Sequence, residues 1–192
     1  MVESSMRAQQ RYLGLSPDER SIPEEDLVSP EVVTFTREAS RCLRRQLYVP
    51  GRLRGGLLFG AQKGETLEII LASPMGYPWW YADSQQVPLH LDERYVLGWS
   101  DCMEALHSGR IDWVGNWLAH PNSALGDERE DLTWLDLGAE LGLFDDRHIL
   151  LVIGWTDGSL AGRAYSYDFG ERKYLSCELG VVLLPIAYGE SP

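Results

Sequence analysis

The chain has 192 residues, a mass of 21.7 kDa and a formal net charge of −12. This length predicts one domain with a short appended segment, large enough to bury a core without disulfides or metal ions. The acidic balance disfavours binding to nucleic-acid backbones, which depends on lysine and arginine. Three scattered cysteines favour a reducing compartment over a disulfide framework. No apolar run approaches the ~20 residues of a membrane helix, and the polar first twenty residues resemble no signal peptide. We therefore expect a cytoplasmic protein that binds neither nucleic acid nor membranes.

The first 29 residues differ in composition from the rest of the chain. Residues 1–29 are rich in charge, serine and proline, and they predict an N-terminal extension with one short helix, Glu3–Leu13. The remaining residues, 30–192, are predicted to form the domain.

Hydrophobic periodicity and turn signals predict strands and helices that alternate along this domain. The predicted strands are 31–35, 54–60, 66–72, 111–118, 149–155, 161–167, 174–178 and 181–187. The predicted helices are one between Thr36 and Pro50, one at 92–107 and one at 131–143. A loop is expected after 118, because His120-Pro121 follows it. This order indicates an α/β or α+β fold with a mixed sheet flanked by helices.

Two motifs in this order resemble the JAB/MPN domain family over roughly residues 31–168. The first is the Gly-Gly-Leu-Leu-Phe-Gly strand that ends at Gly60, and the second is Val114-Gly115-x-Trp117-x-x-His120-Pro121. The resemblance implies a cytidine-deaminase-like mixed sheet with flanking helices. Active members, called JAMM, are zinc isopeptidases that cleave ubiquitin-like tails or process small sulfur carriers.

The metal motif of the active members is only partly present here. It needs a His-x-His pair, a serine eight residues after the second histidine, an aspartate three residues later, and an upstream glutamate as base. Three such ligands leave a zinc position open for water, and the glutamate takes the proton of that water. This chain has Leu118 for the first histidine, His120 for the second, Glu128 for the serine, Asp131 for the aspartate and Leu53 for the glutamate. Leucine neither binds metal nor transfers a proton, so we expect no conventional catalysis and no zinc.

Two interpretations of the remaining polar residues stay open. His120, Glu128 and Asp131 could together hold a divalent metal such as zinc, although one histidine and two carboxylates suit harder ions better. Alternatively, His120 is a loop histidine, Asp131 caps the following helix, and Glu128 is a solvated charge.

The functional expectation is a non-catalytic JAB/MPN-like domain that acts as a protein-interaction or scaffold module. The implied partner is another MPN-like protein or a ubiquitin-like protein, with a homodimer as an alternative. Candidate binding residues are the aromatic loop Tyr77–Tyr81, with Trp79, Trp80 and Tyr81, and the groove around Trp117. The Arg37–Arg45 helix face is either solvated or a site for an acidic partner.

Two rival functions remain. One is a divergent metal-dependent isopeptidase or peptidase acting on a ubiquitin-like or peptide tail. The other is an unrelated α+β binding domain.

Overall fold

The structure is a computed structural model of the whole chain. It describes residues 28–47, 54–74, 89, 91–108, 110–168 and 170–179. Four predicted features lie outside these residues: the helix Glu3–Leu13, Leu53, the loop Tyr77–Tyr81 and the strand 181–187.

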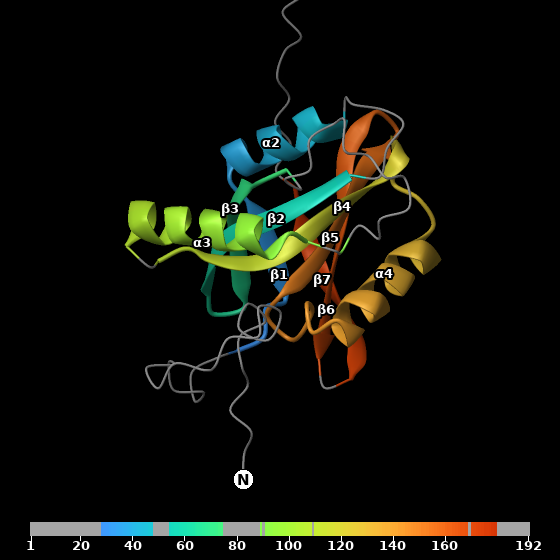
Figure 1. Cartoon of the computed structure of the whole chain (residues 1–192). Helices are drawn as coiled ribbons and strands as arrows, with labels where there is room; N and C mark the ends of the chain where they lie inside the picture. The colour runs from blue at the N-terminus through green and yellow to red at the C-terminus, as the bar shows by residue number, and fades with distance from the viewer. Residues whose placement is uncertain are drawn as a thin grey trace, which may run out of the picture.

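The described part of the chain contains seven strands and three helices (Figure 1). In chain order they are β1 (Val32–Phe35), α2 (Arg37–Leu47), β2 (Arg54–Lys63), β3 (Thr66–Ala72), α3 (Glu93–His107), β4 (Asp112–Ala124), α4 (Glu128–Glu140), β5 (Ile149–Thr156), β6 (Ser159–Asp168) and β7 (Glu171–Glu178). The sequence predicted each of these elements, although several boundaries differ.

The strands form one closed barrel in the order β1-β3-β2-β4-β5-β6-β7. Parallel pairing of β1 with β7 closes it and places Val33 opposite Cys177. The predicted α/β, JAB/MPN-like arrangement of a mixed sheet flanked by helices is therefore wrong. The physical reason is that closure joins two short strands from opposite ends of the described chain, and local sequence patterns carry no signal for such a pairing.

The interior of the barrel is one hydrophobic cluster. Every strand contributes to it, and α2 adds Ala39, Leu43 and Leu47. Figure 1 shows α2 lying across one end of the barrel. Ala39, Leu43 and Leu47 recur every four residues, so they share one face of α2, and this face closes the end of the barrel.

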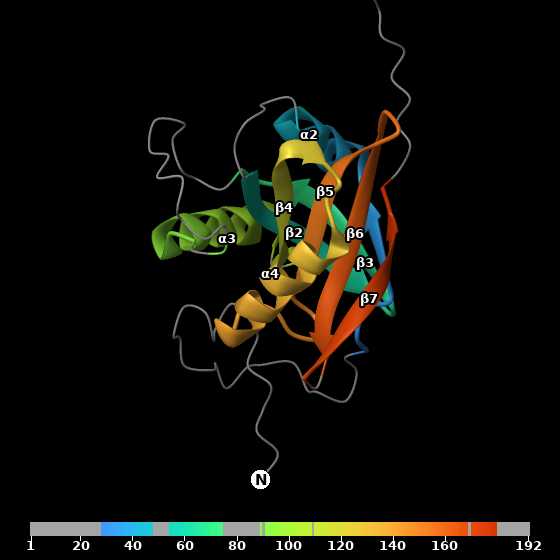
Figure 2. The same cartoon turned by 90° about the vertical axis from the view of Figure 1, so that its right-hand side faces the viewer.

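A second cluster covers the outside of β2, β4, β5 and β6. Strand β5 supplies both clusters by alternation, with Leu151 facing inward and Leu150 and Val152 facing outward. The outward side chains are covered by α3 and α4, which flank the barrel in Figure 2. Because both faces of β5 are buried, its sequence is continuously apolar.

Strand β4 continues through the His-Pro pair, where the sequence predicted a loop. Its register with β5 is interrupted between Ala119 and Ala124. Pro121 lies in this interruption, so its missing N–H costs no bond to β5. His120 is therefore a buried strand residue, and its description as a loop histidine is wrong.

Helix α4 begins three residues before the predicted start. Asp127 is the N-cap, and its carboxylate accepts a hydrogen bond from the Arg129 backbone N–H at 3.0 Å. Asp131 lies inside the first turns with no exposed surface, so the prediction that it caps the helix is wrong.

Candidate functional site

A polar cluster lies between α4 and the outer face of the barrel. Its members come from three elements: His120 from β4, Asp131 from α4, and Arg163 and Tyr165 from β6. Alternation along β4 and β6 turns these strand residues outward, away from the barrel interior. The carboxylate of Asp131 is the group that the other three share.

Each oxygen of the Asp131 carboxylate has a partner. Nε2 of His120 lies 3.1 Å from Oδ1. Oδ2 accepts hydrogen bonds from Nε of Arg163 at 2.6 Å and from the Tyr165 hydroxyl at 2.8 Å. Asp131 is 0% exposed, so this positive charge and these donors offset the cost of burying the carboxylate.

The histidine ring is fixed from several sides. Its Nδ1 lies 3.3 Å from a carboxylate oxygen of Glu130. The Trp134 ring packs against it with a centroid distance of 4.6 Å. A Cβ at Gly126 would lie 2.8 Å from Nε2, so glycine is required for the loop to approach the ring. Arg163 also donates to the Gly126 carbonyl at 2.8 Å, which ties this loop to β6.

Tyr165 is a neutral hydrogen-bond donor in this cluster. Burial raises its pKa well above the ordinary value, and the hydrogen bond to Asp131 raises it further. A phenol in this environment keeps its proton throughout the physiological range. The cluster therefore has the chemistry of a structural network, in which every group is engaged with another.

The remaining positions of the metal motif do not converge on this cluster. Leu118 is 1% exposed and packs in the outer hydrophobic cluster. Glu128 is exposed on the first turn of α4, beside the exposed Tyr174 of β7. Leu53 lies outside the described residues.

The donor set does not fit a catalytic metal. Across the described ranges, no group of three or more His, Cys, Asp or Glu side chains is placed to bind one. His120 and Asp131 of the motif do meet, but the guanidinium of Arg163 already neutralises the Asp131 carboxylate. A divalent cation there would have to displace Arg163 and the Tyr165 hydroxyl, which makes the His120, Glu128 and Asp131 triad a poor ligand set.

The other predicted binding residues are placed as follows. Trp117 is 0% exposed inside the barrel, and its indole N–H donates to the Ser73 carbonyl at 2.7 Å. Its assignment to a surface groove is therefore wrong; the physical reason is that β4 turns this side chain into the barrel interior. Trp79, Trp80 and Tyr81 lie outside the described residues.

On the Arg37–Arg45 face, Arg37 and Arg45 are exposed. Arg41 lies 3.6 Å from Glu38 one turn away, in a surface ion pair.

Sequence reasoning missed Arg163 and Tyr165. The signal was a lone arginine within the strand segment Leu160–Tyr165, where the other residues are small or apolar. A charge in a strand flanked by buried residues requires a partner, and Asp131 is the buried acid that supplies it.

Comparison with known proteins shows similarity at the level of the fold. No family model matches the sequence, and neither does any curated protein. The chain is similar to the solution structure of protein DSY2949 from Desulfitobacterium hafniense, a structural genomics target. The TM-score is 0.51 at 16% identity, covering 76% of this chain and 91% of that one. None of the helices in the described ranges is both long enough and apolar enough to cross a membrane.

Proposed function

We propose that this protein is a non-catalytic interaction module that acts in the cytoplasm by binding another protein. The observation that carries the proposal is the saturation of the Asp131 carboxylate by His120, Arg163 and Tyr165. These groups hold α4 against the barrel, and the Asp131 carboxylate is therefore engaged and not available as a base or a metal ligand.

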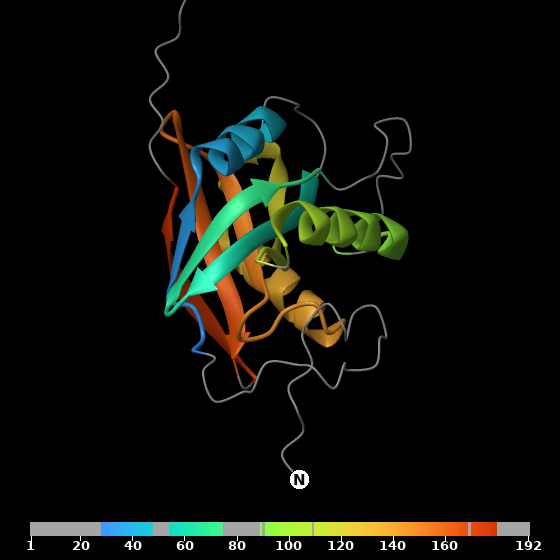
Figure 3. The same ribbon diagram turned by 90° about the vertical axis from the view of Figure 1, so that its left-hand side faces the viewer.

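The surface of α3 supports a binding role. Leu97 and Leu106 on this helix are 37% and 71% exposed. Gly98, Cys102 and Ala105 between them are also exposed. Figure 3 shows α3 lying along the side of the barrel. Small and apolar side chains on an exposed helix allow close approach of another chain.

Purification of the tagged protein from its source cells, with and without a chelator, tests this function. A stoichiometric protein partner is expected, unchanged by the chelator, and metal analysis of the purified chain should give less than about a tenth of an ion per chain. The partners implied by the resemblance, a second MPN-like domain or a ubiquitin-like protein, are the first to examine. A solitary chain that cleaves a ubiquitin-like tail in a zinc-dependent way would contradict the proposal.

The rival metallopeptidase function makes an opposite prediction for one variant. If His120 binds a catalytic metal, His120→Ala abolishes cleavage and lowers the metal content. If the proposal holds, the same variant loses stability and leaves metal content unchanged. Measuring both quantities on one preparation separates the two functions.

A further inference from the structure

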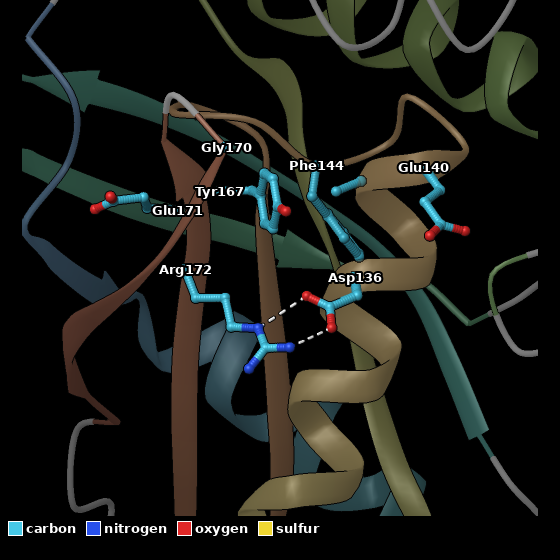
Figure 4. Close-up of a pocket in the computed structure, with 8 residues that line it drawn as sticks. Asp136, Glu140, Phe144, Tyr167, Gly170, Glu171 and Arg172 are labelled. Carbon is cyan, nitrogen blue, oxygen red and sulfur yellow. Dashed lines mark hydrogen bonds and ion pairs between the residues drawn. The ribbon is translucent and has the colours of Figure 1, made fainter.

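The groove between α4 and the β6–β7 hairpin is bridged by an ion pair of its own. It has a volume of about 740 Å³, and Arg172 donates to both carboxylate oxygens of Asp136 across it. Figure 4 shows this pair, with Glu140 and Glu171 pointing away from it. The acidic side chains of the groove are therefore either paired or divergent, and they do not converge on a ligand. The outward face of α3 has a better-defined arrangement.

The outward face of α3 carries exposed residues spaced three and four positions apart. They are Arg94, Leu97, Gly98, Asp101 and Ala105. Val96 and Met103, on the opposite side of the helix, pack in the outer hydrophobic cluster. A Cβ at Gly98 would meet nothing within 4 Å, so the space above the middle of the exposed face is open. Leu106 falls on a different side of the helix and is not part of this face.

The two charges of this face are opposite in sign and do not pair with each other. Arg94 and Asp101 lie roughly two turns apart along α3, whereas ion pairs within a helix join residues three or four positions apart. Arg94 contacts Asp92 at 3.5 Å, but these side chains are 92% and 44% exposed, and an ion pair this exposed is weak. Both Arg94 and Asp101 can therefore contact charges of another chain.

This arrangement of charges is complementary to itself. In a two-fold symmetric dimer, residue i contacts residue j of the second copy while j contacts i. Two antiparallel α3 helices, related by an axis that passes between Leu97 and Gly98, place Arg94 of each chain level with Asp101 of the other. Leu97 then meets Leu97 of the second copy, and the two Gly98 residues allow the helix backbones to approach closely. Two ion pairs and a small apolar centre therefore form together.

We propose that a second copy of this chain binds the outward face of α3, in an antiparallel helix pair with two Arg94–Asp101 ion pairs. A contact limited to one helix from each chain is smaller than the about 1,200 Å² at which stable interfaces begin, so the dimer should be weak. We expect a dissociation constant on the order of 100 µM. At low micromolar concentration the chain is then mostly monomeric, and substitutions on α3 act there on the fold of one chain. The inference rests on the proposed function in taking α3 as a binding surface, and it names the second copy as the chain that binds there.

Charge reversal in the full chain tests the pairing. Arg94→Asp and Asp101→Arg each bring like charges together twice in the dimer. Each should raise the dissociation constant at least about tenfold in sedimentation equilibrium. An equimolar mixture of the two variants should dimerise as the parent chain does, because every contact then joins an acid of one chain to a base of the other. Both variants remain strongly acidic, so their net charges do not explain such a rescue.

The matched controls are Lys63→Glu and Glu65→Lys on the β2–β3 hairpin, which make the same changes of charge away from α3. They should dimerise as the parent chain does, both alone and in a mixture. The circular dichroism spectrum of each variant reports whether it is folded, so a folding defect cannot pass for lost dimerisation. A parent chain that is still monomeric at about 1 mM would overturn the inference. A mixture of Arg94→Asp with Asp101→Arg that stays monomeric would also overturn it.

Failure of this inference and failure of the proposed function give different results. A monomeric chain that co-purifies with a different protein contradicts the dimer and leaves the proposed function standing. A dimer that the mixed variants restore, with no other protein co-purifying, supports the inference and shows that the proposed function is wrong.

Discussion

The position of α4 on the barrel depends on Asp131. A buried ionised carboxylate costs several kcal/mol unless charge and hydrogen bonds offset that cost. Here Arg163 supplies the charge, and Tyr165 and His120 supply further contacts from two strands. Each contact also fixes a direction, so the cluster specifies how the helix lies on the barrel as well as stabilising it.

Replacing Asp131 by alanine should therefore be severe. The variant leaves the Tyr165 hydroxyl buried without its acceptor, and it leaves the Arg163 guanidinium, whose side chain is only 27% exposed, unpaired. We expect Asp131→Ala to lower the free energy of unfolding by about 3 kcal/mol. The matched control, Asp127→Ala, removes the exposed N-cap of the same helix and should cost about 1 kcal/mol. Urea unfolding measures both, and equal losses would contradict the central role of Asp131.

The sequence predicted two of the four residues of this cluster. The motif spacing put His120 and Asp131 in one hypothesis, and the structure places them 3.1 Å apart. Arg163 and Tyr165 stayed hidden because their contact with α4 depends on the register of β6, which local patterns do not specify. The third group at the Asp131 carboxylate is the guanidinium of Arg163, which the metal motif does not include.

Asp146 carries a pH-dependent prediction. Burial raises the pKa of this carboxyl, Asp145 and Asp168 raise it further, and Arg147 lowers it. A carboxyl with a folded-state pKa above its unfolded value stabilises the fold when protonated, and that stability is lost as the pH rises through the folded pKa.

Asp146→Asn should therefore raise the melting temperature at pH 7. The gain should shrink as the pH falls toward the ordinary carboxyl range near 4, because Asp146 then becomes neutral in the parent chain. Thermal melts of both proteins between these pH values measure the effect, with the exposed Asp101→Asn on α3 as control. A gain that is the same at both ends of the range would show that ionisation is not its cause.

At the scale of elements, the packing of the C-terminal half of α4 depends on Gly138, which has no side chain and so allows the Phe144 ring to lie against the helix. A Cβ at Gly138 would lie 2.2 Å from ring carbons of Phe144, which is 3% exposed and cannot move aside. Alanine normally stabilises a helix relative to glycine by up to about 1 kcal/mol. Here the steric overlap should outweigh this helix propensity, and Gly138→Ala should lower the free energy of unfolding by about 1–3 kcal/mol, as overpacking of a core does.

The chain offers a matched control for this substitution. Gly98 lies in α3, and a Cβ there would meet nothing within 4 Å. Gly98→Ala should therefore stabilise the protein by up to about 1 kcal/mol. Opposite signs for the two substitutions in denaturant unfolding would confirm the packing of α4 on the loop that contains Phe144. Two gains would show that Phe144 yields.

Element positions were largely predictable, because periodicity and turn residues are local properties. The errors cluster between 118 and 131, where strand β4 runs through Pro121 and α4 starts at Glu128. Proline there indicated a break, yet the strand continues because its pairing with β5 is already interrupted at that point. A break in pairing with a neighbouring strand is a tertiary property, so the sequence alone did not report it.

At the scale of the whole molecule, the decisive feature is the seam between β1 and β7. Only three residue pairs join them, from Val32–Ser176 to Thr34–Glu178. Without this pairing, the same order of strands and helices would be compatible with an open mixed sheet. The solution structure from Desulfitobacterium hafniense resembles the chain at 16% identity, so the fold is reached by sequences with few residues in common.

Cys177 lies at this seam and reports whether it opens. Burial, together with the smaller effect of the Glu178 carboxylate, raises the pKa of its thiol to about 12. Only the thiolate reacts with a disulfide reagent, so at pH 8 the closed barrel should suppress labelling on the order of a thousandfold relative to an ordinary thiol. Cys42→Ser with Cys102→Ser leaves Cys177 as the single thiol for this measurement.

If the barrel opens only as a unit, the labelling of Cys177 in increasing urea should yield the same free energy as global unfolding, because the most protected positions of a domain exchange only then. A chain that keeps Cys102 alone, exposed on α3, gives the unprotected rate. Labelling of Cys177 at a free energy well below that of global unfolding would show that the three-pair seam separates while the rest of the sheet stays folded. The seam would then be a local point of entry into the barrel, and the closed fold would depend mainly on the long pairings of β2, β4, β5 and β6.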